Sequence, residues 1–209
     1  TLGGTLFPYT TLFRSRIFAY EYNGYWKDVG TLGSYWEANM ELIDIIPEFN
    51  LYEEYWKIYT KSDRIQPQYI SSDANITKCI IGEGSEIYGE VTNSVIGSVV
   101  VIEEGAVVKD SIIMQDSVIV KGAVVEKSII AEDVKVGAGA HLGVGEYAPS
   151  KYDQKVYQFD LVTVGEHSVI PENVKIGKNT AISGATAAED YPNGELESGG
   201  YIIKAGGIV

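Results

Sequence analysis

A six-residue spacing runs through the chain from about Ile70 onward and constrains its fold more than any other feature. An aliphatic residue recurs at this spacing, and a small residue stands four places after it. A longer period is superimposed, because Ile96, Ile113 and Ile130 lie 17 residues apart. The aliphatic and small residues pair as Ile70 with Ala74, Ile81 with Ser85, Ile102 with Ala106, Ile113 with Ser117, Ile119 with Ala123, Val136 with Ala140, Val164 with Ser168 and Ile176 with Thr180. Three short strands per turn, with the aliphatic side chains pointing to a common axis, explain both periods.

Stacked turns of this kind form parallel sheets and bury an aliphatic ladder that a single turn could not bury alone. A fully buried Ile or Val stabilises a fold by about 1.5–3 kcal/mol relative to an exposed one. We therefore expect a charge on the ladder, as in Ile113→Asp, to be severely destabilising. Glycines follow several axial residues, where they tolerate a tight corner. They are Gly82, Gly97, Gly137, Gly165 and Gly177.

The spacing is interrupted between Gly143 and Leu161, where residues 147–151 (YAPSK) predict a surface loop. Repeat proteins expel insertions as loops on one face. Such a loop is either a tolerated insertion or part of a binding surface, and the sequence leaves both open. The ladder then resumes with Val164, Ile170, Ile176 and Ile182. In the tail, residues 184–209 predict a turn and a closing strand near 201–204 that caps the open end of the stack, where unpaired strand edges are a liability.

Residues 16–65 follow a different pattern. The stretch 16–22 (RIFAYEY) is typical of a strand, and Asn23-Gly24 indicates a turn. Ser34 and Glu37 have the spacing of a capping box, which predicts a helix that starts at Ser34 and ends before Pro47. Asp28 stands between the extended segment and the helix. In α/β proteins ligands bind at such junctions, so Asp28 is either a ligand-binding carboxylate or a turn and capping residue.

Composition excludes several classes of protein. The 209 residues include 29 Asp and Glu against 16 Lys and Arg, a net charge of −13, which disfavours binding to nucleic acid. No apolar run is long enough for a membrane span. The single Cys79 rules out an intrachain disulfide and favours a reducing, cytoplasmic location. The chain starts at Thr1, and its leader, residues 1–15, has no periodicity and resembles a translated sequencing adaptor. We therefore expect a fragment with a leader that is not native.

Five stretches carry a resemblance to a known family. The most specific is 24–31 (GYWKDVGT), and the others are 34–40 (SYWEANM), 56–60 (WKIYT), 89–97 (GEVTNSVIG) and 111–115 (SIIMQ). Together they resemble bacterial glucose-1-phosphate adenylyltransferases over about residues 16–206. The resemblance implies a mainly β chain: a left-handed parallel β-helix over residues 66–209, preceded by a remnant of an α/β nucleotidyltransferase domain at 16–65.

The family resemblance implies transfer of an adenylyl group from ATP to glucose 1-phosphate, with Mg²⁺, for glycogen synthesis. The protein mainly positions the phosphates and neutralises their charge. By the same resemblance, Asp28 is a metal carboxylate and Trp26 lies against the glucose moiety. The family's glycine-rich nucleotide loop, its other metal Asp and the Lys that holds the sugar phosphate have no counterpart here. We therefore expect no catalytic residue within this chain and no activity from it alone.

The resemblance also implies a homo-oligomer, a tetramer in the family, and a site for an anionic activator on the β-helix. Activators of this family are sugar phosphates, so their site needs local cations. Lys175 and Lys178, near the end of the ladder, are the candidates, although solvated corner residues are the simpler explanation of both.

Three other functions stay open at this point. Hexapeptide acyltransferases use an outward-facing His as general base, and His141 and His167 both stand at non-axial positions. That hypothesis leaves the 24–31 motif unexplained. A non-catalytic oligomerisation or regulatory module is supported by the repeat alone. A nucleotidyltransferase of another specificity, such as guanylyl transfer to mannose 1-phosphate, is the third. The residues that select the nucleobase belong to the other half of such enzymes, so only the local motif favours adenylyl transfer to glucose 1-phosphate.

Overall fold

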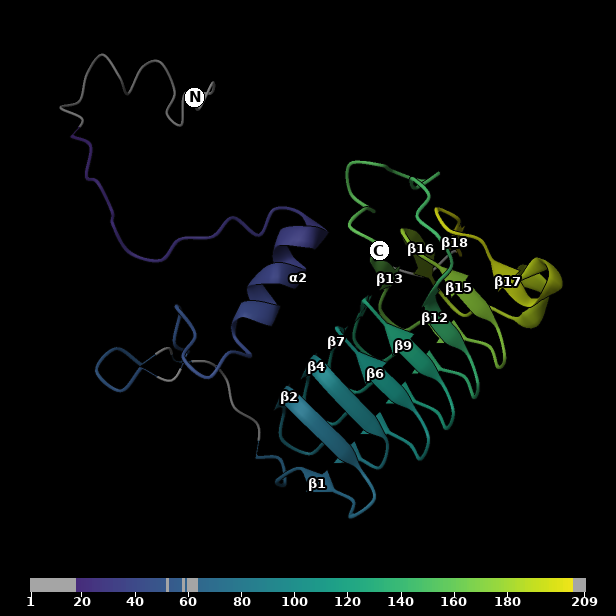
Figure 1. Ribbon diagram of the computed structural model, residues 1–209, viewed down its shortest axis with the longest axis horizontal. Helices are drawn as coiled ribbons and strands as arrows, with labels where there is room; N and C mark the ends of the chain where they lie inside the picture. The colour runs from purple at the N-terminus through teal and green to yellow at the C-terminus, as the bar shows by residue number, and fades with distance from the viewer. Residues whose placement is uncertain (1–17, 52, 58, 60–63, 205–209) are drawn as a thin grey trace.

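The computed structural model describes residues 18–51, 53–57, 59 and 64–204 (Figure 1). The leader predicted at 1–15 lies outside the described residues, as does the start of the strand predicted at 16–22. From residue 69 to residue 203 the chain winds into a stack of coils whose strands pair in parallel (Figure 1). The predicted repeat architecture is confirmed.

Each coil contributes a strand to each of three faces. The first face contains β1 (Tyr69–Ile70), β3 (Glu86–Ile87), β5 (Val101–Ile102), β8 (Val118–Ile119), β11 (Lys135–Val136) and β14 (Val169–Ile170). The second contains the first halves of β2 (Asn75–Ile81) and β4 (Glu90–Ile96), then β6 (Val107–Lys109), β9 (Val124–Glu126), β12 (His141–Val144), β15 (Lys175–Gly177) and β17 (Glu195–Leu196). The third contains the second halves of β2 and β4, then β7 (Ile112–Ile113), β10 (Ser128–Ile130), β13 (Val162–Val164), β16 (Thr180–Ser183) and β18 (Tyr201–Ile203).

The axial ladder is the core of the stack. Ile102, Ile119 and Val136 lie in register on the first face, and none of the three has any exposed surface. Ile113 and Ile130 are equally buried on the third face. The first member of the predicted series differs, because Ile70 is 48% exposed. It belongs to the first coil, which has a neighbour on one side only.

The predicted small residues are buried, except the partly buried Ala74 of the first coil, and serines among them make hydrogen bonds between coils. The Ser85 hydroxyl donates to the carbonyl of Gly97 at 2.8 Å and accepts the N–H of Val100 at 3.2 Å. Ser117 likewise donates to the carbonyl of Ala131 and accepts the N–H of Val134. A small side chain fits the corner, and its hydroxyl satisfies backbone groups that a buried corner would otherwise leave unpaired.

The glycines after axial residues have a different role from the one predicted. Gly97 and Gly177 do not have positive φ angles. Instead, a Cβ at Gly97 would lie 2.8 Å from the nitrogen of Gln115, and one at Gly177 would lie 2.3 Å from that of Ser198. Both glycines therefore allow one coil to approach the backbone of the next. The left-handed corners are formed by other residues, which are Gly105, Gly122, Gly139 and Asn173 in one stack and Asp116, Asp133 and His167 in another.

Helix α2 (Leu32–Glu41) begins earlier and ends earlier than predicted. Its N-cap is Thr31, whose hydroxyl accepts the N–H of Ser34 at 3.1 Å, while the Ser34 hydroxyl accepts the N–H of Thr31. Ser34 is thus the reciprocal partner in the capping box, three residues inside the helix, and not the cap. The helix stops at Leu42, whose N–H donates to the carbonyl of Asn39, and the N–H of Ile43 donates to that of Met40.

The prediction of a strand at 16–22 is wrong for residues 18–22, which are the described part of that range. Residues 18–22 are extended but belong to no sheet, and Phe18, Tyr20 and Tyr22 are all more than half exposed. A β-strand requires a neighbour to receive its backbone hydrogen bonds. No described strand lies beside these residues, so their aromatic and branched composition is not sufficient.

The tail adds a further coil where a single closing strand was predicted. After β16, two short 3₁₀ turns, Ala188–Asp190 and Pro192–Gly194, lead to β17, and β18 follows. Both strands pair in parallel with the preceding coil. Tyr191 is buried beneath this coil, which raises the pKa of its phenol to about 12, and its hydroxyl lies 2.8 Å from that of Thr186.

The insertion is a loop, as predicted, but two residues shorter at its start, because β12 runs through Val144 and the loop spans 145–161. It folds back on the coils. Lys151 N–H donates to the carbonyl of Gly199 at 2.7 Å, and Tyr152 stacks near Tyr201 with ring centroids 5.0 Å apart. No described helix is long and apolar enough to cross a membrane.

Candidate functional site

Helix α2 is attached to the third face of the β-helix (Figure 1). Leu32, Tyr35, Trp36 and Met40 of the helix pack against a small apolar cluster centred on Ile112, Ile129 and Leu161. These core residues point outward from the coils, so the face is hydrophobic on both sides. The indole N–H of Trp36 donates to the carbonyl of Asp110 at 2.8 Å. The helix is therefore held on the repeat at its middle.

Asp28 lies in the exposed segment that leads into this helix. Its Oδ1 accepts the N–H of Gly30 at 2.9 Å, and the rest of the carboxylate faces solvent. On one side Thr31 caps the helix. On the other, Lys27 forms ion pairs with Glu41 and Glu37, and its hydrogen bond to Glu41 lowers the pKa of that carboxyl and raises the pKa of the Lys27 ammonium. Asp28 is thus an accessible carboxylate on a segment tied to α2 at both ends.

The residues present suit Mg²⁺ only as part of a larger site. Mg²⁺ is commonly bound through one or two carboxylates together with phosphate oxygens and water. Asp28 can supply one such oxygen. No group of three or more His, Cys, Asp or Glu side chains that could hold a metal ion occurs among the described residues.

Trp26 is 76% exposed and is not among the residues that line the cavity next to it. A nearby cavity of about 480 Å³ is lined by other residues, namely Tyr22, Tyr25, Glu48, Phe49, Asn50, Glu53 and Trp56. Tyr25 and Phe49 stack there with ring centroids 5.3 Å apart. The sugar contact predicted for Trp26 therefore stays a prediction.

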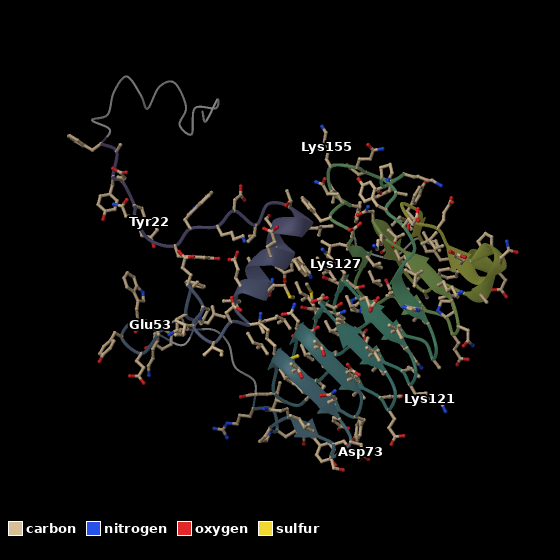
Figure 2. The ribbon with its side chains drawn as sticks, in the orientation of Figure 1. Tyr22, Glu53, Asp73, Lys121, Lys127 and Lys155 are labelled. Atoms are coloured by element: carbon tan, nitrogen blue, oxygen red, sulfur yellow. The ribbon has the colours of Figure 1, made fainter. Side chains whose placement is uncertain are left out.

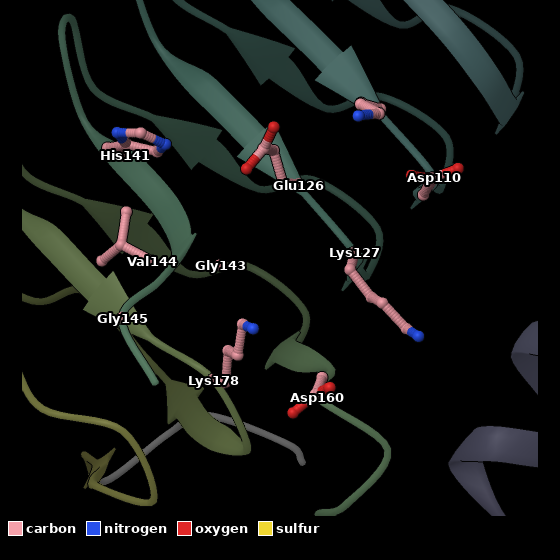
Figure 3. Close-up of a pocket in the computed structure, with 10 residues that line it drawn as sticks. Asp110, Glu126, Lys127, His141, Gly143, Val144, Gly145, Asp160 and Lys178 are labelled. Carbon is pink, nitrogen blue, oxygen red and sulfur yellow. The ribbon is translucent and has the colours of Figure 1, made fainter. Parts of the chain in front are cut away.

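A groove of about 400 Å³ opens where the inserted loop leaves the second face (Figure 3). The groove includes Gly143, which has a φ of +92° and, as a glycine, leaves space where a side chain would stand. A Cβ at this position would lie 2.4 Å from the carbonyl oxygen of Glu126. The pairing of β12 with β15 slips at this point, between Leu142 and Val144. A bulge of this kind redirects side chains and often borders a binding site.

Seven charged or titratable side chains surround the groove: Lys109, Lys127, Lys178, His141, Asp110, Glu126 and Asp160. Lys178 points into it in Figure 3, whereas Lys127 points toward helix α2, where its ammonium lies 4.9 Å from the centre of the Trp36 ring. Asp110 accepts a hydrogen bond from the Asn93 amide at 2.6 Å. Such a mixed lining suits a small ligand that carries both an anionic group and hydrogen-bond donors.

The structure separates the two lysines that were predicted together. Lys178 lines the groove, but Lys175 lies exposed on β15, in register with His141 and Glu195, and is not part of the lining. Lys109 and Lys127 were not predicted as partners of Lys178. Their 18-residue spacing, one coil apart and next to the insertion, is the signal that could have identified them.

The two histidines occupy different settings. His141 lines the groove, whereas His167 lies at an exposed corner with its Nδ1 2.9 Å from Asp133. The hydrogen bond to Asp133 raises the pKa of His167. The acyltransferase hypothesis needs a His in a cleft between subunits, and it stays a prediction.

Comparisons with known proteins support the interpretation of the β-helix and of the segment that precedes it. Residues 64–160 match the family described as GlmU-like, C-terminal hexapeptide. The chain is 71% identical over 204 residues to a protein named glucose-1-phosphate adenylyltransferase from Lachnospira eligens, covering 98% of this chain and 48% of the relative. The resemblance to glucose-1-phosphate adenylyltransferases is confirmed. A relative with the same name from Thermotoga neapolitana is 51% identical, over 91% of this chain and 45% of its own length.

The chain thus spans about half the length of the curated adenylyltransferases that it matches. The coils form the left-handed parallel β-helix that is expected of hexapeptide repeats. Among solved structures, a putative acetyltransferase from Desulfovibrio desulfuricans G20 aligns with a TM-score of 0.43 and 14% identity, over 67% of this chain and 27% of the other.

Proposed function

We propose that this chain supplies the β-helix and the adjoining edge of the catalytic domain of an enzyme that makes ADP-glucose and pyrophosphate from ATP and glucose 1-phosphate. The observation that carries the proposal is the 71% identity to a glucose-1-phosphate adenylyltransferase over 98% of the chain. That match includes the 24–31 motif with Asp28 and Trp26, which an isolated oligomerisation module would not need.

In this proposal Asp28 contributes one carboxylate oxygen to Mg²⁺, which neutralises phosphate charge when it is bound. Trp26 presents an exposed ring to the glucose moiety of the substrate. The Lys27 pairs and the Thr31 cap hold the segment between them, so Asp28 reaches the phosphates from a fixed position. The groups that bind ATP belong to the rest of the enzyme, so the 209-residue chain alone has no adenylyltransferase activity.

The test joins this chain to the preceding half of the Lachnospira eligens relative. We expect the chimera to release pyrophosphate from ATP only when glucose 1-phosphate is present, and the unfused chain to release none. Asp28→Asn should lower kcat of the chimera by about 100-fold or more, because it removes a charge that faces the transferring phosphate. The control is Asp73→Asn, at an exposed position beside the first coil. A chimera that transfers guanylyl or acyl groups instead would contradict the proposal.

We propose further that the groove binds an anionic effector through Lys178, with Lys109 and Lys127 nearby. Lys178→Ala in the chimera should weaken activation by a sugar phosphate, whereas Lys175→Ala, three residues earlier and outside the groove, should leave it unchanged. A homo-oligomeric and cytoplasmic enzyme is part of the same proposal, and light scattering on the chimera tests its oligomeric state.

A further inference from the structure

Three consecutive residues at the end of the inserted loop face two different parts of the molecule. The ring of Phe159 lies over Gly33 in the first turn of α2, where an added Cβ would be only 2.3 Å from its Cδ2. Leu161 packs in the apolar cluster beneath the same helix. Asp160, between them, lines the groove (Figure 3). One short segment therefore contacts both the groove and the helix that follows Asp28.

The backbone of this segment is strained. Phe159 and Asp160 have φ angles of +68° and +64°, a region of backbone conformation that residues other than glycine rarely adopt. The Oδ1 atom of Asp160 is buried and has no hydrogen-bond partner among the described residues. Strain and an unsatisfied buried oxygen together are typical of elements with a second accessible arrangement.

One side chain of the β-helix holds the segment in place. Asn179, fully buried and next to Lys178, accepts the N–H of Asp160 at 2.8 Å and donates to the carbonyl of Ala148 at 2.8 Å. A displacement of this corner of the groove therefore reaches Asp160 directly. Because Asp160 is covalently joined to Phe159, the displacement continues to the ring that lies on Gly33.

We propose that Phe159 and Asp160 form a mechanical link through which the groove controls the position of helix α2, and with it the segment that carries Asp28. The regulatory part of this inference rests on the proposed function, because it treats the groove as the effector site. Gly33 is essential to the link, since any side chain there would displace the Phe159 ring. The coupling is reciprocal: fixing α2 in place also stabilises the occupied groove.

Hydrogen exchange of the 209-residue chain tests the link without any ligand. Asn179→Gly removes the amide that holds Asp160, and glycine accepts the native φ of +55° at this position. We expect amide exchange in residues 31–41 to rise by about fivefold or more in this variant. Phe159→Ala should have the same effect, and the double variant should add little. The matched control is Asn173→Gly, at a corner with a φ of +59° outside the loop, which should leave residues 31–41 unchanged.

Faster exchange in the loop with unchanged exchange in residues 31–41 would overturn the link. A second arm adds inorganic phosphate as a probe of the groove, with binding followed by equilibrium dialysis. We expect phosphate to alter exchange in residues 31–41 of the wild-type chain but not of Phe159→Ala, although both bind it. Phosphate binding without any change in the amide exchange of residues 31–41 contradicts the link but is consistent with the effector site. If phosphate does not bind, the effector proposal fails, and the ligand-free comparison still decides the link.

Discussion

The β-helix and the segment of residues 18–59 place their hydrophobic residues in opposite environments. In the coils, Ile113, Ile119 and Ile130 have no exposed surface. In the preceding segment, Tyr20 and Trp56 are 88% and 84% exposed. Tyr22 of the same segment also lies away from the coils (Figure 2). A repeat carries its own partners, because each axial side chain is covered by the equivalent residue of the next coil. The aromatic residues of 18–59 have no such periodic partner among the described residues, and the segment contacts the coils through helix α2 and through the ion pair of Asp44 with Lys78.

The largest test of this contrast places the same charge in both regions. Ile113→Asp buries a carboxylate among aliphatic side chains and should destabilise the fold by at least ~4 kcal/mol. Ile45→Asp, at a fully exposed position, should change stability by less than about 0.5 kcal/mol. Urea unfolding followed by circular dichroism measures both. Equal effects would show that residues 18–59 form a core of their own in solution.

A smaller effect is expected where two coils approach each other. Gly97→Ala places a methyl group 2.8 Å from the backbone nitrogen of Gln115, which belongs to the next coil and cannot move alone. We expect a loss of about 1–3 kcal/mol. In Gly30→Ala the nearest atom, at 3.0 Å, is Oδ1 of the exposed Asp28, which can rotate away. Thermal unfolding of the two variants should therefore differ clearly, and the same midpoint for both would contradict close packing of the coils.

The junction between the two regions gives a third comparison. Trp36→Phe removes the indole N–H that bonds to the carbonyl of Asp110, and should cost about 0.5–1.5 kcal/mol. Trp56→Phe alters a largely exposed ring and should have little effect. Tryptophan fluorescence during urea unfolding follows both variants. If Trp36→Phe is neutral, the docking of α2 depends on its apolar contacts alone.

The same contrast explains what could be predicted from the sequence. The ladder was predictable because burial in a repeat depends only on spacing, which the sequence displays directly. The strand at 16–22 failed because pairing depends on a neighbour, which local composition does not reveal. The start of α2 was placed at Ser34 because Ser34 and Glu37 mimic a capping box, whereas Thr31 and Ser34 form the real one.

The groove was only partly predictable. Lys178 was identified, and the insertion was recognised as a possible binding surface. Two other contributors, Gly143 and Asp160, carry no local signal, because their importance arises from a slipped register and a left-handed backbone. Such features depend on how coils stack across the insertion, and no spacing rule describes them.

The smallest expected effects concern pH, and their direction differs between the two regions. On the β-helix, the hydrogen bond to Asp133 raises the pKa of His167 above 6.5. The stability from this pair is fully present below that value and is lost as the pH rises through the raised pKa. Near α2, the hydrogen bond from Lys27 lowers the pKa of Glu41 below 4.5. That contribution is present above 4.5 and is lost as the pH falls through the lowered pKa.

Both pairs are exposed, so each change is expected to be small. Asp133→Asn should therefore flatten the neutral limb of the stability profile, while Glu41→Gln should flatten the acid limb, as measured by urea midpoints across the pH range. NMR titration of His167 gives the sharper readout, because its pKa should fall in Asp133→Asn and stay unchanged in Glu41→Gln. A fall in both variants would mean that the helix and the distant corner are electrostatically coupled, which solvent screening between exposed charges opposes.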